Sequence, residues 1–140
     1  MPYPFLKTPV DDDGEKKPTR HYSDKQEKSV AKAVGGKKTP NSGATMYVKG
    51  DVLTKDCCFE CKTIEKHQKT RTIEEVWFTK NKDEALYMNK SYDAVVINFG
   101  EDRPNYYCID EALFKRMKYA LELLDQQLLL QAEILHCYNW

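Results

Sequence analysis

The sequence predicts an α/β fold in which helices flank a central mixed β-sheet and a long helix ends the chain. Helical apolar spacing is found at residues 22–34, 72–89 and 110–137. Strand patterns are found at 57–62, where side chains alternate, and at 92–99, where the run is continuously apolar. Helices and strands that alternate in this way are typical of a sheet covered by helices.

The length of 140 residues fits one domain with a core of its own. Residues 1–20 hold four of the six prolines and the triplet Asp11-Asp12-Asp13, with few periodic apolar positions. Such a segment is expected to be a flexible N-terminal tail. We therefore predict a single domain at residues 21–140.

Composition argues against a membrane-spanning or a secreted protein, and net charge does not indicate a partner. The 22 basic and 22 acidic residues cancel, so net charge alone does not indicate a nucleic-acid binder. No apolar run approaches the roughly 20 residues of a membrane helix, and the N-terminus lacks a signal-peptide core. The five cysteines are odd in number. We expect a cytoplasmic protein without a membrane partner.

The first helix is predicted to start with a capping box formed by Ser23 and Gln26, and to end at Gly35-Gly36. Its expected apolar side is Val30, Ala33 and Val34.

Glu27 lies three and seven residues before Val30 and Val34, so its side chain is expected to face inward. An acid on an apolar face needs a cation, a metal or water. The alternative is an edge residue that pairs with Lys28 or Lys32.

Residues 37–44 read as a loop of turn-forming residues beside two lysines. Backbone N–H groups and a serine hydroxyl in such a loop can contact a phosphate. Further basic residues are expected to cluster around the candidate site, and the alternative is that these are ordinary solvated loops. They are Lys49, Lys55, Lys62, Lys66, Lys69 and Arg71. The predicted phosphate contacts, which would be DNA contacts if the substrate is DNA, are Lys37, Lys38, Asn41, Ser42, Lys49 and Lys80.

Residues 51–62 form a strand, turn and strand that hold the main candidate site. In the second strand Cys57, Phe59 and Cys61 face one way, while Cys58, Glu60 and Lys62 face the other. The turn at 54–56 is expected to bring Asp51 near Glu60. Cys57 and Cys61 are expected in the core.

Two carboxylates and one amine suit metal-assisted hydrolysis of a phosphodiester. Asp51 and Glu60 offer hard oxygen ligands to Mg²⁺, and Lys62 can orient the attacking water or offset developing charge. The alternative is a solvated strand face with a surface Glu–Lys pair.

In the second half, Thr72 and Glu75 predict another capping box. Trp77 is expected in the core, and the alternative is a base-stacking role. Residues 92–99 and 104–109 read as a buried strand and its hairpin partner. Asp110 is expected to cap the long helix.

The long helix carries more apolar surface than a domain this small needs to cover, which predicts a dimer contact. Its apolar stripe is Leu113, Met117, Ala120, Leu121, Leu124, Leu128 and Gln131, widened by Leu129, Leu130, Ile134 and Leu135.

Glu27, Pro40-Asn41-Ser42-Gly43, Gly50-Asp51 and Glu60-Cys61-Lys62 together resemble the PD-(D/E)xK nuclease superfamily, and within it the archaeal and phage-type Holliday-junction resolvases of DNA recombination and repair. The resemblance covers residues 22–110 and implies a restriction-endonuclease-like core. Gly50 stands where the superfamily name has proline.

The resemblance implies that Glu27, Asp51, Glu60 and Lys62 are catalytic. Asp51, Glu60, Glu27 and the backbone carbonyl of Cys61 would bind Mg²⁺, with Mn²⁺ able to substitute. It also implies that Ser42 touches the scissile strand and that a homodimer cuts both strands of a four-way junction. Two alternatives stay open: a nuclease for another DNA substrate, of restriction or repair type, and a catalytically inactive DNA-binding module.

Overall fold

The computed structural model describes residues 19–40 and 48–138 of the chain. They belong to two compact units, one ending at Cys108 and one starting at Ile109. The predicted tail up to residue 18, together with Asn41 and Ser42, lies outside the described residues.

The first unit contains a mixed five-stranded sheet with the strand order β1-β2-β3-β4-β5. Strands β1, β2 and β3 are successively antiparallel, β4 runs parallel to β3, and β5 is antiparallel to β4. The predicted mixed sheet and the β4–β5 hairpin are confirmed. The strands are β1 (Lys37–Lys38), β2 (Val52–Leu53), β3 (Cys57–Lys62), β4 (Tyr92–Ile97) and β5 (Tyr106–Cys108).

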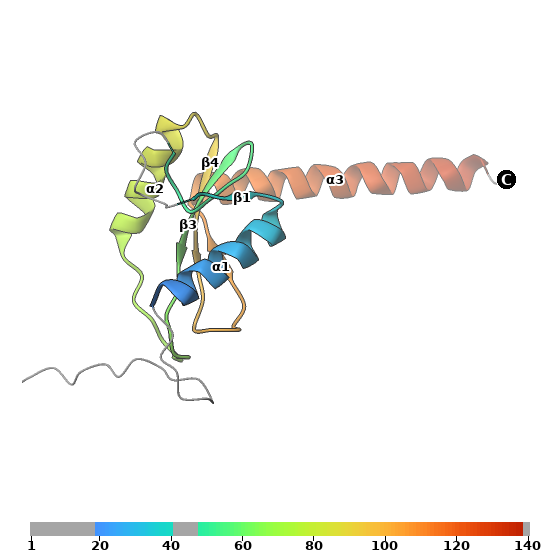
Figure 1. The fold of residues 1–140 in the computed structure, drawn as a ribbon. Coiled ribbons are helices and arrows are strands. Elements are labelled where there is room, and N and C mark those ends of the chain that lie inside the picture. Colours follow the sequence, from blue (N-terminus) through green and yellow to red (C-terminus); the bar gives the residue numbers. More distant parts are fainter. Residues whose placement is uncertain (1–18, 41–47, 139–140) are drawn as a thin grey trace, which may run out of the picture. The chain divides into compact units, whose positions relative to one another are not determined.

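Two helices flank this sheet. Helix α1 (Thr19–Val34) packs against β1, β2 and β3, and helix α2 (Glu75–Tyr87) packs against β3 and β4. They lie on opposite sides of the central strands (Figure 1). An α/β fold with helices on both sides of the sheet is therefore confirmed.

Both predicted capping boxes are wrong. Helix α1 already begins at Thr19, so Ser23 lies inside it, and α2 begins at Glu75 after an N-cap, Glu74, that makes no side-chain hydrogen bond. The predicted end of α1 is correct: Gly35 has a φ of 65°, and the Gly36 N–H donates to the Ala31 carbonyl at 2.9 Å. This is the Schellman arrangement, which favours glycine at the left-handed position.

The buried side of α1 differs from the predicted one. It consists of Tyr22, Gln26, Glu27 and Val30, whereas Ala33 is exposed. The reason is that α1 begins earlier than predicted, at Thr19. The face that meets the sheet is then set by residues four apart, namely Tyr22, Gln26 and Val30.

The core lies mainly between the central strands and the two helices. Its fully buried side chains include Val30, Val52, Val95 and Val96. Cys58 is also fully buried, whereas Cys57 and Cys61 are only partly buried, so the expectation that the latter two are core residues is wrong. Trp77 is half-buried, so it is not the core residue that we expected.

Asn81 on α2 is a buried polar residue that links β3 to β4. Its side-chain amide donates to the carbonyls of Cys58 and Ala94 at 3.3 and 3.0 Å. Its Oδ1 accepts the Cys58 thiol at 3.2 Å. With no exposed surface, Asn81 has all its partners inside the protein.

We expect Asn81→Ala to destabilise this unit by about 2–5 kcal/mol, because it opens a cavity and leaves buried groups unsatisfied. The melting temperature should then fall by about 10 °C or more. Thermal unfolding followed by circular dichroism measures this. Asp83→Ala, at an exposed position on the same helix, is the control and should melt like the native chain. Equal melting of both variants would contradict the structural role of Asn81.

The second unit is helix α3 (Glu111–Tyr138), which has no buried residue. The Leu113 N–H donates to the Asp110 carboxylate at 2.8 Å, so the predicted cap is confirmed. The described part of the chain contains no helix with both the length and the apolarity needed to cross a membrane.

Candidate active site

Asp51 and Glu60 come together because of the register between β2 and β3. Val52 pairs with Phe59 and Leu53 with Cys58, so the next position outward places Asp51 opposite Glu60. The intervening turn is closed by Thr54, whose backbone N–H donates to the Cys57 carbonyl and whose hydroxyl accepts the Cys57 N–H, both at 3.0 Å. The predicted fold-back of Asp51 is confirmed.

Asp51 is fixed by three hydrogen bonds. Its carbonyl accepts the Thr39 N–H at 2.9 Å, and its own N–H donates to the Phe59 carbonyl at 3.0 Å. Its carboxylate accepts the Cys61 N–H at 2.8 Å. These contacts hold the carboxylate beside β3, so little ordering is needed before it binds a ligand.

Gly50, just before Asp51, has a φ of 79°. A Cβ at this position would lie 2.5 Å from the Cys58 Sγ, closer than any real contact. Proline would not fit, since its ring fixes φ near −65°. The chain therefore needs glycine here to direct Asp51 into the site.

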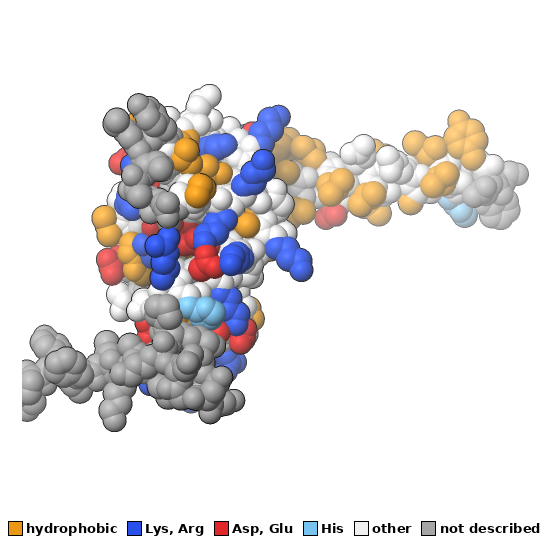
Figure 2. Space-filling view, viewed as in Figure 1, with side chains coloured by type: hydrophobic (Ala, Val, Ile, Leu, Met, Phe, Trp, Pro, Cys, Tyr) orange, Lys and Arg blue, Asp and Glu red, His pale blue; other side chains and the backbone are white. Residues whose placement is uncertain are grey.

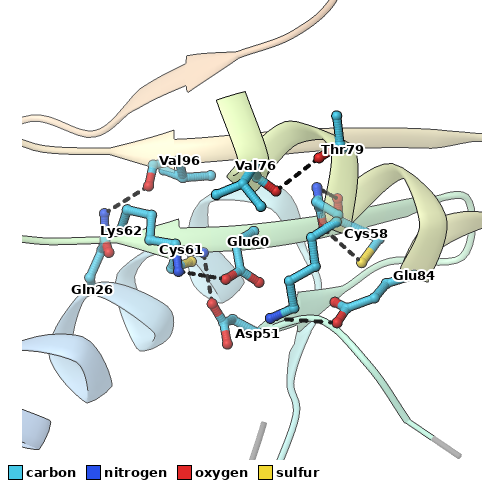
Figure 3. A network of polar contacts seen from close by, with 12 residues as sticks. Gln26, Asp51, Cys58, Glu60, Cys61, Lys62, Val76, Thr79, Glu84 and Val96 are labelled. Carbon is cyan, nitrogen blue, oxygen red and sulfur yellow. Dashed lines mark hydrogen bonds and ion pairs between the residues drawn. The ribbon is translucent and has the colours of Figure 1, made fainter. Parts of the chain in front are cut away.

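Glu60 is one of the few buried acids and is 7% exposed. Burial raises its pKa, and the nearby Asp51 carboxylate adds to this, while Lys62 opposes it. The Lys62 Nζ lies 2.8 Å from the Glu60 carboxylate. Figure 3 shows the carboxylates of Asp51 and Glu60 converging beside β3, with Lys62 reaching Glu60. This contact confirms that Glu60 and Lys62 share one face of β3, as predicted.

Glu27 faces inward, as expected, and is 8% exposed. Burial raises the pKa of Glu27, and the negative charge of the Asp51 carboxylate raises it further. Glu27 therefore lies close to the same site. Its cation partner is Lys38 on β1, at 3.3 Å. The alternative pairing with Lys28 is wrong, because Lys28 pairs with Asp24 at 2.6 Å.

These residues line one cavity of about 470 Å³. Acidic side chains gather near the middle of this face of the molecule, and lysine and arginine side chains surround them (Figure 2). A mixed surface of this kind accepts a phosphate only with the help of its cations. The walls are Arg20, Ser23, Asp24, Glu27, Lys38, Thr39, Asp51, Glu60, Cys61 and Lys62.

The predicted DNA contacts are spread over the unit. Lys38 lines the cavity and is held by Glu27 and Asp24, whereas Lys37 is exposed at the sheet edge. Lys80 pairs with Glu84 at 3.7 Å and also lowers the pKa of Glu60. Lys49 lies outside the cavity walls. Asn41 and Ser42 are not among the described residues.

Sequence reasoning missed Asp24 and Thr39, and it placed Arg71 near the site only as one member of a basic cluster. Asp24 lies three residues before Glu27, a helical spacing that places both on one side, and this signal was available. Thr39 reaches the site because Lys37–Lys38 is a strand, which two lysines do not indicate. Arg71 donates to the Lys62 and Asn98 carbonyls at 2.8 and 2.6 Å, contacts that no local pattern marks.

The donor set fits a hard divalent cation, although the side chains are not arranged around one. Within residues 19–40 and 48–138, no three Asp, Glu, His or Cys side chains form a group that could hold a metal ion. Instead Asp51 accepts an N–H and Glu60 and Glu27 pair with lysines. The Asp51 and Glu60 carboxylates nevertheless suit Mg²⁺, because they repel each other and a divalent cation between them would offset that repulsion. Their oxygens are also the ligand type that Mg²⁺ prefers.

Comparison of the chain with family models, with curated proteins and with solved structures gave no match. The function is therefore argued from the geometry of this site.

Proposed function

We propose that this protein is a Mg²⁺-dependent endonuclease of the PD-(D/E)xK type with a restriction-endonuclease-like core. Its substrate is DNA, and it acts as a Holliday-junction resolvase that nicks four-way junctions as a homodimer. The mixed sheet with helices on both sides is consistent with that core.

The convergence of Asp51, Glu60 and Lys62 in one cavity carries this proposal. A solvated strand face does not account for it, because Glu60 is buried and burial raises its pKa. A buried acid close to a second carboxylate costs folding free energy, and such costs are typical of functional sites.

The residues divide the chemistry between them. Asp51, Glu60 and the Cys61 carbonyl would hold the cation, which when bound polarises the phosphoryl oxygen and lowers the pKa of a bound water. Lys62, held by Glu60 at 2.8 Å, orients the attacking water and offsets charge on the phosphate. Lys38 keeps Glu27 at the edge of the site.

A homodimer supplies the second active site that a four-way junction requires. Helix α3 exposes its apolar side chains along its whole length, and a second copy of the same helix would cover them.

A labelled four-way junction and a linear duplex with the same arm sequences test the proposal. We expect paired nicks in the junction with Mg²⁺ and none with chelator. Metal-dependent cutting of both substrates would instead support a restriction or repair nuclease. Metal-independent binding without any cutting would reject the nuclease and leave the inactive DNA-binding module.

A further inference from the structure

A second cavity, of about 490 Å³, lies beside the catalytic cavity; we call it the side cavity. Cys61 and Lys62 line both cavities, so a ligand held at Lys62 can extend from one into the other. The other walls of the side cavity include Gln68, Arg71 and Trp77. None of these three was assigned a role in the site above.

Arg71 is a half-buried cation without an acid partner among the described residues. Its Nη1 donates to the Lys62 carbonyl at 2.8 Å and to the Asn98 carbonyl at 2.6 Å, which uses both hydrogens of that nitrogen. Its buried Nε has no acceptor in the part of the chain that the structure describes. Burial lowers the pKa of Arg71. A bound anion would offset the cost of burying this charge.

Trp77 lies next to this cation. The Arg71 Cζ is 5.7 Å and the Lys62 Nζ is 5.5 Å from the centre of its ring. A partly exposed indole with two cations over its ring matches the two parts of a nucleotide, because bases stack on aromatic rings and phosphates pair with lysine and arginine.

We propose that the side cavity binds the nucleotide next to the scissile phosphate, with Arg71 pairing with its phosphate and Trp77 stacking on its base. The identity of the scissile strand rests on the proposed function. A base reaches the indole only after leaving the duplex stack, which costs less where DNA is branched or frayed. The side cavity would thereby favour branched DNA over continuous duplex.

The test measures binding in chelator, so it does not require cleavage. In a Trp140→Phe background, Trp77 is the only tryptophan, since the sequence contains two. A short oligothymidylate is titrated against an abasic oligomer with the same number of phosphates. We expect the oligothymidylate to quench the Trp77 fluorescence and to bind about tenfold more tightly.

Two variants at position 77 separate stacking from packing. With fluorescently labelled oligomers and anisotropy as the readout, Trp77→Phe should keep most of the preference for the oligothymidylate. Trp77→Leu should lose it, although leucine also fills space. Equal binding of both oligomers by the native protein, or an unchanged preference in Trp77→Leu, would overturn the proposal.

Arg71 is tested separately, because it should contact phosphate rather than base. Arg71→Lys keeps the charge but loses the guanidinium fork, so it should weaken both oligomers by the same factor and leave the salt dependence of binding unchanged. Arg103→Lys makes the same change at an exposed position that does not line the side cavity; it is the control and should bind like the native chain. If Arg71→Lys fails to fold, the two Trp77 variants decide the question.

The binding and cleavage experiments together distinguish the nucleotide site from the nuclease activity. Base-dependent binding without metal-dependent cutting would keep the nucleotide site and reject the nuclease. Cutting that does not depend on Trp77, together with base-independent binding, would keep the nuclease and reject the site.

Discussion

Asp51→Asn is expected to reduce the single-turnover rate of DNA cleavage by at least about 100-fold, since even indirect partners of metal ligands are worth about 10–100-fold. The amide keeps an oxygen that can accept the Cys61 N–H, so the local structure should persist. It lacks the negative charge that holds a divalent cation. Binding of a four-way junction should remain near the native level, because loss of a negative charge does not repel phosphate.

The matched control is Asp56→Asn, which makes the same chemical change at an exposed position in the turn between β2 and β3. This variant should cleave like the native protein. Melting temperatures of both variants separate lost chemistry from lost folding. Native cleavage by Asp51→Asn would reject the proposed metal-binding role, whereas equal loss in both variants would point to the turn rather than to the carboxylate.

The sequence patterns predicted the parts of the fold that depend on local periodicity. The alternation along β3, the apolar run of β4 and the Asp110 cap are each set by a few neighbouring residues. Strand β1 was missed because two lysines carry no strand signal; pairing with β2 makes them a strand. The capping boxes failed because packing against the sheet, and not the cap, fixes where α1 begins.

The candidate site was predictable in its centre and not at its edges. Asp51, Glu60 and Lys62 lie on one hairpin, so strand register alone brings them together. The partner of Glu27 was not predictable from α1, because Lys38 reaches it from a strand eleven positions later in the sequence, and helical spacing suggested nearer lysines. Burial of Glu60 depends on the whole fold, so no local pattern reports it.

Helix α3 carries a regular heptad pattern that indicates a coiled coil. Its positions alternate in steps of three and four residues, and the exposed fractions of its apolar members run from 50 to 84%. The series is Phe114, Met117, Leu121, Leu124, Leu128, Gln131, Leu135 and Tyr138. Helices gain most of their stability by burying an apolar face, and a second copy of α3 in the proposed homodimer would bury this one. A second copy in register would place Gln131 against itself, which is how a polar core position sets register.

Leu121→Lys is therefore expected to raise the dissociation constant of the dimer by about 1000-fold or more, because each of two copies loses a buried leucine and gains a buried charge. Light scattering after size-exclusion chromatography, over a range of protein concentrations, measures this. Leu123→Lys makes the same change two residues away, on the opposite side of the helix, and should remain dimeric.

The same two variants link assembly to activity. If the dimer supplies one active site per strand, Leu121→Lys should still nick a junction, because the catalytic cavity is formed within the first unit. The nicks should then occur singly, and paired cuts within one binding event should disappear. Paired cuts that persist in a monomeric Leu121→Lys variant would show that α3 does not join the two active sites, and a monomeric native protein would reject the coiled coil itself.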